Sequence, residues 1–226
     1  MARRMKEKPE AHRKRIAEAA GALFEEKGIS MTTMNEIAQR AGYSKATLYV
    51  YFRDKEEIVG YLVLSSMKRL KEYLALALIG EKSYRERYMA ICHAMVSYEE
   101  EYPFYFSLVL DYINIDFEHS HCEESERETF LIGEKINSLL ADFFTCGMET
   151  GVFRSQLDVR VVIFSIWGML SGLIQLAENK QAYISREMCL DKKEFLEKGF
   201  LLLYDAIEEK ENTGNSRRPS YRRNVC

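Results

Sequence analysis

The chain has 226 residues, of which 47% are hydrophobic and 30% charged, and it contains only 3 prolines and 12 glycines. That length allows one large domain or two small ones with a sizeable buried core, while the formal net charge of −3, taken as an average, argues against a nucleic-acid partner. Few helix breakers interrupt the runs in which apolar residues recur three and four positions apart, and this spacing predicts an all-α fold.

The N-terminal segment is charged and no apolar stretch follows it, so a secretory signal is not expected. Five cysteines without paired short spacings fit a reducing compartment and need no disulfides. These two observations predict a cytoplasmic protein.

Charge is distributed unevenly along the chain. Residues 1–53 carry 11 Lys and Arg against 6 Asp and Glu, residues 54–210 carry 17 against 28, and residues 211–226 carry 4 against 1. Attraction to phosphate depends on the local field within a Debye length of roughly 8 Å. We therefore expect a polyanion to bind the first of these segments.

Local signals predict two helices at the start of the chain, the second of them short. One is expected over about residues 9–27, where apolar residues fall on one face, and Gly28 ends it. The second is expected over about residues 34–40, because Thr33 and Glu36 have the spacing of a capping box.

A third helix of about eight residues is expected after Ser44, a good N-cap, and Gly42 permits the positive φ that a tight turn needs. Leu48 and Phe52, four positions apart, are its expected core residues. Two short helices joined by a turn with glycine are the signature of a helix-turn-helix. The side chains left for the outside include three rings, a cation and a hydroxyl, namely Tyr43, Lys45, Thr47, Tyr49 and Tyr51.

Helices separated by a glycine are more often parts of an ordinary bundle, and that alternative stands beside the DNA-binding one. A solvated face rarely needs three tyrosines, whereas a phosphate-lined groove uses hydroxyl donors, a cation and stacking rings together. The local positive charge points the same way. A fourth helix is expected from its cap Asp54, with Glu57 at the capping-box position, to about Ile79.

The stretches "RIAEAAGALFEEKG", "TTMNEIAQRAGYSKATLYVYF" and "RDKEEIV" resemble the TetR-type bacterial transcriptional regulators. The resemblance is close over about residues 9–60, where the capping threonine, the turn glycine, the Leu-Tyr-x-x-Phe pattern and the following lysine occur in register. The rest of the chain matches that family only in being helical and of suitable length.

The resemblance implies that the third helix lies in the major groove of double-stranded DNA. Tyr43, Lys45 and Ala46 would be closest to base edges, with Lys45 donating to guanine and the Ala46 methyl touching a thymine methyl. Val50 departs from the polar or aromatic residue that many relatives have there and is assigned no base contact. Met34 has no hydrogen-bonding group and makes at most an apolar contact.

The same resemblance implies contacts with the DNA backbone. The side chains expected to hold phosphates are Thr33, Thr47, Tyr49 and Lys55, with Tyr51 able to serve either bases or phosphates and the cap Ser44 completing the DNA-binding set.

Five further helices are expected beyond residue 60, at about residues 82–101, 103–113, 123–150, 158–179 and 192–211, which makes about nine in all. The expected domains are a helix-turn-helix DNA-binding domain at residues 9–60, a helical ligand-binding and dimerisation domain at residues 61–211, and a disordered basic tail at residues 212–226.

The penultimate helix has no charge from Val161 to Ala177, a run at the short limit for a membrane span. A buried helix is the preferred interpretation, and a membrane-anchored protein the disfavoured one. Small and polar residues form one stripe, and TetR-type proteins dimerise through their last two helices. The expected homodimer seam is Ser165, Gly168, Gly172 and Gln175 with Phe200, Leu203 and Ile207, the alternative being packing within one subunit.

Aromatic residues gather around residues 98–117, and aromatics at helical spacing are usually core. The alternative is the wall of a pocket in which rings and a carboxylate hold an aromatic or cationic effector. The residues expected in that pocket are Tyr98, Tyr102, Phe106, Asp111, Tyr112 and Trp167.

Other chemistry is not predicted. His119, His121 and Cys122 fit no compact zinc spacing, so neither a metal nor another cofactor is expected, and no catalytic motif is present. The predicted function is a ligand-responsive regulator, a repressor that binds a palindromic operator as a dimer and is released by a small molecule. The alternative is a small-molecule-binding helical protein or enzyme with no specific DNA site.

Overall fold

The computed structural model describes residues 8–80, 83–111 and 124–210. Within these ranges the chain forms ten helices, and the one β-type pairing is an isolated bridge between Phe153 and Glu208. The all-α prediction is confirmed. The helices are α1 (Pro9–Lys27), α2 (Met34–Ala41), α3 (Lys45–Tyr51), α4 (Lys55–Ala77), α5 (Tyr84–Glu101), α6 (Pro103–Asp111), α7 (Glu124–Glu149), α8 (Val159–Asn179), α9 (Gln181–Met188) and α10 (Lys192–Ile207).

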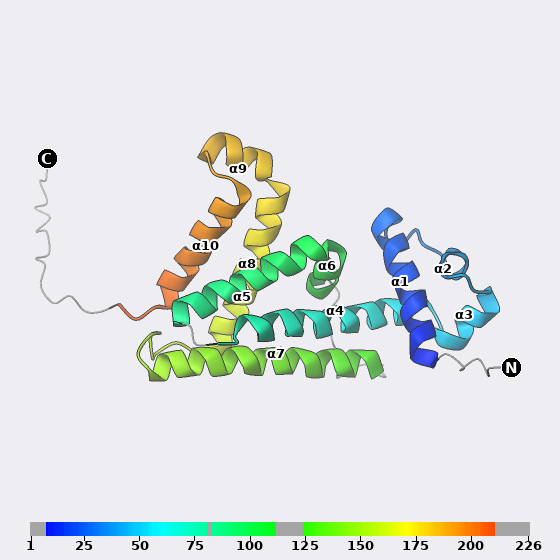
Figure 1. The fold of residues 1–226 in the computed structure, drawn as a ribbon, viewed down its shortest axis with the longest axis horizontal. Coiled ribbons are helices and arrows are strands. Elements are labelled where there is room, and N and C mark those ends of the chain that lie inside the picture. The colour runs from blue at the N-terminus through cyan, green and yellow to red at the C-terminus, as the bar shows by residue number, and fades with distance from the viewer. Residues whose placement is uncertain (1–7, 81–82, 112–123, 211–226) are drawn as a thin grey trace, which may run out of the picture.

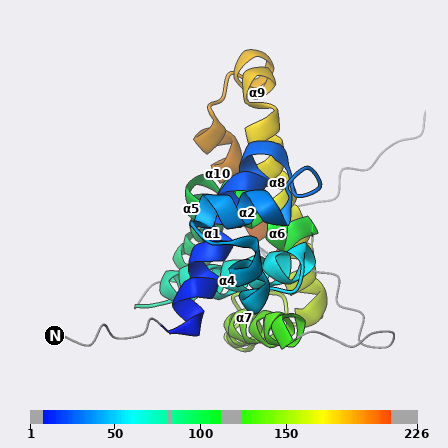
Figure 2. The ribbon, with the colours of Figure 1, turned by 90° about the vertical axis from the view of Figure 1, so that its right-hand side faces the viewer.

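Helices α1, α2 and α3 form a head at one end of the molecule, and α4 runs from this head along the body (Figure 1). Helices α5, α6 and α7 pack around α4, whereas α8, α9 and α10 rise from the body on the side away from the head. Figure 2 shows the head in front of this bundle, with α2 crossing the view above α4.

Two hydrophobic clusters stabilise the chain, and α4 contributes to both. Its first turns supply Ile58 and Leu62 to the head cluster, and its later turns supply Leu70 and Leu74 to the body cluster. The domain boundary predicted after residue 60 falls inside this continuous helix, and it stays a prediction. Residues 212–226, the predicted basic tail, lie outside the described residues.

Helix α6 is the second element shared by the two clusters. Leu108 is buried in the head cluster and Phe106 in the body cluster. The Phe104 ring lies with its centroid 6.4 Å from that of Phe24 on α1. This nine-residue helix therefore packs against both the head and the body, and the Ser66 hydroxyl on α4 donates to its Tyr105 carbonyl at 2.8 Å.

Two features of the C-terminal part differ from the sequence prediction. Helix α9 was not predicted, because it is short and Ile184 is its one buried residue. The last helix ends at Ile207 rather than near residue 211, because Glu208 is extended and faces Phe153 in the bridge. The Arg154 amide donates to the Ile207 carbonyl at 3.0 Å, which satisfies a carbonyl at the helix end.

Helix α8 is the one helix of the described residues with the length and composition to cross a membrane. One face of it is buried in the body through Val162, Ile166, Leu170 and Ile174, while Val161 and Phe164 on the other side are exposed, so the predicted buried helix is buried only in part.

Candidate nucleic-acid interface

The turn between α2 and α3 is set by two local signals that the sequence predicts correctly. Gly42 has φ of 77°, a left-handed conformation that costs glycine little, and its amide donates to the carbonyls of Ala38 and Gln39. The Ser44 hydroxyl accepts from the Thr47 amide at 3.0 Å and so caps α3. These contacts fix the start of a seven-residue helix that is too short to be stable alone.

The inner face of α3 is fixed by burial. Leu48 and Phe52 are both 0% exposed in the head cluster, as predicted. Lys45, Ala46 and Tyr49 are exposed on the opposite side, and the Lys45 ammonium lies 6.0 Å from the centroid of the Tyr49 ring. The structure therefore presents the three side chains together on one outward surface, and their contacts with DNA stay predictions.

Tyr43 and Tyr51 were expected on the outside of α3, and the structure places both half-buried against α1. The Tyr43 hydroxyl accepts from Arg15 at 2.7 Å and shares a 2.6 Å hydrogen bond with His12. The rings of Tyr51 and His12 are stacked with centroids 5.1 Å apart. The prediction that these two tyrosines face outward is wrong, because α1 offers polar and aromatic partners 28 to 39 residues earlier in the chain.

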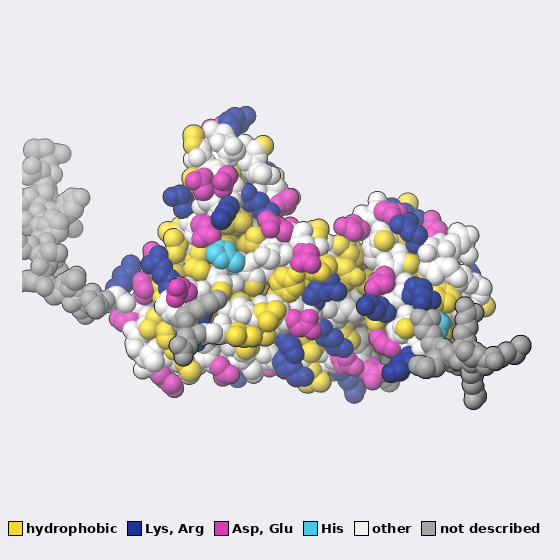
Figure 3. All heavy atoms as spheres, viewed as in Figure 1, with side chains coloured by type: hydrophobic (Ala, Val, Ile, Leu, Met, Phe, Trp, Pro, Cys, Tyr) yellow, Lys and Arg dark blue, Asp and Glu magenta, His cyan; other side chains and the backbone are white. Residues whose placement is uncertain are grey.

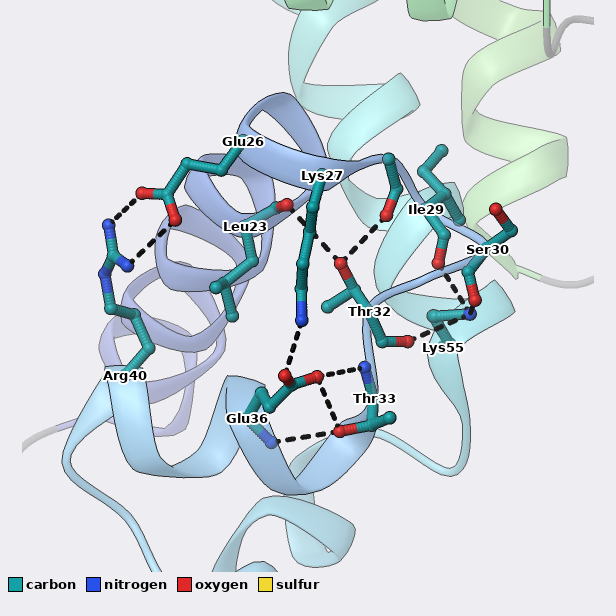
Figure 4. Close-up of polar contacts among 11 residues, drawn as sticks. Leu23, Glu26, Lys27, Ile29, Ser30, Thr32, Thr33, Glu36, Arg40 and Lys55 are labelled. Carbon is teal, nitrogen blue, oxygen red and sulfur yellow. Dashed lines mark hydrogen bonds and ion pairs between the residues drawn. The ribbon is translucent and has the colours of Figure 1, made fainter.

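Thr33 and Glu36 form the predicted capping box at the start of α2 (Figure 4). The Glu36 amide donates to the Thr33 hydroxyl at 3.3 Å, and the Glu36 carboxylate accepts from the Thr33 amide at 2.9 Å. The hydrogen bond from Lys27, at 2.5 Å, and those from Thr33 lower the pKa of Glu36 to about 2. Thr33 is exposed, but its hydroxyl already donates to Glu36.

Lys55 was expected to hold a phosphate, and the structure turns its ammonium toward the α1–α2 loop instead. The Nζ atom donates to the carbonyls of Ile29 at 2.6 Å and Thr32 at 3.1 Å, with Ser30 at 3.4 Å (Figure 4). These carbonyls follow the end of α1, where helical partners are no longer available. The geometry gives Lys55 a structural contact that the phosphate prediction did not include.

The capping box predicted at the start of α4 is formed only in part. The Asp54 carboxylate accepts from the Glu57 amide at 2.8 Å, as predicted. The Glu57 carboxylate does not complete the box at Asp54, because it accepts from the Arg53 amide at 2.7 Å and from Arg13 at 3.0 Å. Arg13 thereby links α1 to the start of α4.

Ion pairs neutralise part of the positive charge of the head. Arg40 pairs with Glu26 at 2.5 Å, and Lys27 pairs with Glu36. On the face shown in Figure 3, cationic and anionic side chains are interspersed over the head and the body alike. No carboxylate among the described residues pairs with Lys45, so its charge remains available to a ligand.

The body contains a cavity of about 580 Å³ between α4, α6, α7 and α8. Of the predicted pocket residues, Trp167 lines it, whereas Tyr98 and Phe106 are core residues elsewhere in the body. Tyr102 lies under the Arg69 guanidinium, 4.1 Å from its ring centroid. The lining residues are Met67, Val109, Leu110, Thr129, Phe130, Gly133, Glu134, Ile136, Asn137, Phe164, Trp167, Gly168 and Ser171.

The remaining members of the predicted pocket cannot be placed against the cavity. The side chain of Asp111 and the whole of Tyr112 lie outside the described residues, as do His119, His121 and Cys122. Among the residues that are described, no group of three or more His, Cys, Asp or Glu could hold a metal ion. Sequence reasoning missed the α7 wall because its apolar positions also fit an ordinary core helix.

The predicted dimer seam separates into two parts. Ser165, Gly168, Gly172 and Gln175 are all exposed along one side of α8, next to Phe164, which is 68% exposed. Three members came from α10, and of these Leu203 is half-buried. Phe200 and Ile207 are core residues of the body, so their prediction as contacts with a partner subunit is corrected. The outward α10 residue is Leu202, at 70% exposure.

The architecture and the capped α2–α3 unit define a helix-turn-helix head on a helical body. The sequence profile described as "Bacterial regulatory proteins, tetR family" matches residues 16–62. The match lies in the head, which is therefore similar to that of the tetR family of bacterial regulatory proteins.

Relatives match the head closely and the whole fold more distantly. The HTH-type transcriptional regulator TtgR of Pseudomonas putida is 38% identical over 77 residues, 34% of this chain and 36% of the relative, so the match spans about a third of that protein. The structure of PfmR from Thermus thermophilus aligns with a TM-score of 0.63 at 28% identity, covering 84% of this chain and 97% of that one. FadR from Bacillus subtilis, solved with stearoyl-CoA, aligns with a TM-score of 0.65 at 19% identity, covering 86% and 99%.

Proposed function

We propose that this protein is a transcriptional repressor that binds a two-fold symmetric operator as a homodimer and is released from DNA by a small molecule bound in the body. The observation that supports this proposal is that Lys45, Ala46 and Tyr49 are exposed together on α3. This helix is held in place by its Ser44 cap and by the buried side chains of Leu48 and Phe52. Relatives of the head are described as transcriptional regulators, which supports action in the cytoplasm and argues against an enzyme.

The roles that we propose for the side chains of α3 follow from their exposure and their functional groups. Lys45 can donate to guanine O6 and N7, and the Ala46 methyl can contact a thymine methyl in the major groove. Tyr49 and Thr47 suit phosphates, since they offer hydroxyl donors beside the base-reading pair. Tyr43 and Tyr51 support α3 from behind, because their rings and hydroxyls engage α1.

The exposed side of α8 is the surface we propose for the partner subunit. It combines glycines that allow close approach with exposed apolar side chains such as Phe164 and Leu176, and Leu202 adds to it from α10. Two copies of α3 would read a two-fold symmetric site if the dimer holds them about 34 Å apart, one helical turn of DNA.

Release by an effector requires a physical link between the cavity and the head, and α6 supplies one. Val109 and Leu110 line the cavity, while Leu108 beside them is 1% exposed in the head cluster. A molecule that prefers one position of α6 therefore biases the head toward the conformation that accompanies it. FadR from Bacillus subtilis, with its stearoyl-CoA, is a precedent for a ligand in this fold.

The test is binding of the full chain to the DNA upstream of its own gene at physiological salt. Lys45→Ala should lose about 1–3 kcal/mol of discrimination at one base position, while the body variant Lys68→Ala should bind as the wild type does. A mobility-shift competition against a library of operator variants measures both. If no sequence binds more than about tenfold tighter than random DNA, the repressor proposal fails and the small-molecule-binding alternative is favoured.

A further inference from the structure

The cavity wall contains one enclosed polar atom without a partner. Ser171 is 7% exposed and lines the cavity, and its hydroxyl makes no hydrogen bond to any described residue. Helical hydroxyls commonly donate to the carbonyl one turn earlier. Thr129 on the α7 wall does so, to Ser125 at 2.7 Å. Buried polar groups are otherwise satisfied in folded proteins, so the Ser171 hydroxyl is an unsatisfied hydrogen-bonding group in a residue that lines the cavity.

The charges of the residues that line the cavity also restrict which ligands it can bind. Among the described residues that line the cavity there is no lysine, arginine or histidine. Glu134 is the one lining residue with a carboxylate, and it is exposed at the rim, where it accepts from Asn137 at 3.1 Å. An organic anion would leave water here and meet no compensating cation among the described lining residues. A neutral or cationic molecule carries no such penalty.

The rest of the wall is apolar and has room for a molecule of ordinary effector size. A cavity of about 580 Å³ lies within the range of small-molecule sites. Phe130 and Phe164 line the cavity at 41% and 68% exposure, and Phe164 also belongs to the side of α8 proposed for the partner subunit. A Cβ placed on Gly168 would meet nothing within 4 Å, so the helix leaves open space beside the cavity.

We propose that the cavity binds a mostly apolar molecule that is neutral or singly cationic, with a hydrogen-bonding group received by Ser171 or a positive end received at Glu134, and that it disfavours organic anions. This inference rests on the proposed function in naming the effector class of the same site.

The single tryptophan of the chain, Trp167, lines the cavity and supplies a direct readout. Three probes share one ten-carbon chain and are used below their micelle concentrations: 1-decanol, decyltrimethylammonium and decanoate. In fluorescence titrations of the full chain, decanol and decyltrimethylammonium should give saturable changes in Trp167 emission. Decanoate should bind at least about tenfold more weakly.

Two variants separate the two receiving groups. Ser171→Ala should weaken decanol about tenfold through the lost hydrogen bond and leave decyltrimethylammonium unchanged. Glu134→Gln should weaken decyltrimethylammonium about threefold in low salt and leave decanol unchanged. Ser138→Ala, at an exposed serine of α7 that does not line the cavity, is the control and should change neither. Thermal unfolding should show that Ser171→Ala is as stable as the wild type, since it removes an unsatisfied group.

The outcomes that overturn this inference are distinct from those that overturn the proposed function. Tightest binding of decanoate, no effect of Ser171→Ala on decanol, or no saturable change with any probe would each refute the ligand class, whatever the protein does with DNA. Saturable probe binding in a protein that shows no operator preference would refute the repressor and leave the cavity assignment standing.

Discussion

The head presents a fixed surface on the short helices α2 and α3, whereas the body has a partly open cavity between α6 and the longer helices α4, α7 and α8. Helices α2 and α3 have eight and seven residues, and caps and side-chain contacts to α1 hold them. Helix α7, which forms one wall of the cavity, has 26 residues and is held by apolar packing. Capped short helices place side chains in one defined arrangement, as base reading requires, while apolar walls accept molecules of varied shape. Each prediction below tests one side of this contrast.

The largest expected effect is the loss of a buried anchor of α3. Phe52→Ala should cost about 3–5 kcal/mol and abolish specific DNA binding, because its ring packs in the head cluster with Arg13 over it at 4.3 Å. Val50→Ala, at a site 76% exposed, should stay within about 0.5 kcal/mol of the wild type. Denaturant unfolding measures both, and Trp167 emission shows whether the body stays folded. A Phe52→Ala protein with normal DNA binding would contradict the rigid head.

The next effect concerns two lysines with different surroundings. Lys55→Ala should destabilise the head by about 1–3 kcal/mol, because three loop carbonyls lose their donor. Lys45→Ala should leave stability unchanged. The salt dependence of binding to random DNA is the second measurement. If its slope falls by about one in Lys55→Ala, the side chain contacts a phosphate in the complex and the structural role is incomplete.

The smallest effect is a pH dependence from the capping box of α2. Hydrogen bonds from Lys27 and Thr33 hold the pKa of Glu36 at about 2, below its usual 4.5. Because the pKa of this carboxyl is lower in the folded chain than in the unfolded chain, its ionised form stabilises the folded state at pH values above the unfolded pKa. That contribution is lost as the pH falls from about 4.5 toward 2. The stability difference between wild type and Glu36→Gln should therefore shrink across this window. A difference that stays constant from pH 6 to 2.5 would show that the carboxylate contributes nothing.

The features predictable from sequence were those encoded within a few residues. The capping box of Thr33 and Glu36, the turn at Gly42 and the anchors Leu48 and Phe52 depend on neighbours at most four positions away. The positions of Tyr43 and Lys55 depend on partners 23 to 31 residues distant, which no local pattern reveals.

In the body, too, the features that depend on residues far apart in the sequence could not be predicted. The small-residue stripe predicted on α8 lies on the exposed side of that helix, and its role as a dimer seam stays a prediction. The cavity combines residues of four helices, and a sequence cannot say which of two apolar helix faces meets a neighbour and which borders empty space. Phe200 was predicted at the dimer seam and fills the core, whereas Trp167 was predicted in the pocket and lines the cavity.

Because α4 is one continuous helix from the head to the body, a small tilt at one end displaces the other end. Its 23 residues extend for about 34 Å at 1.5 Å per residue, and it has no break where the two clusters meet. A tilt of about 5° at the cavity end would therefore move the far end by about 3 Å, the length of a hydrogen bond. A displacement too small to open the body would thus suffice to pull the base-reading side chains out of register with a half-site.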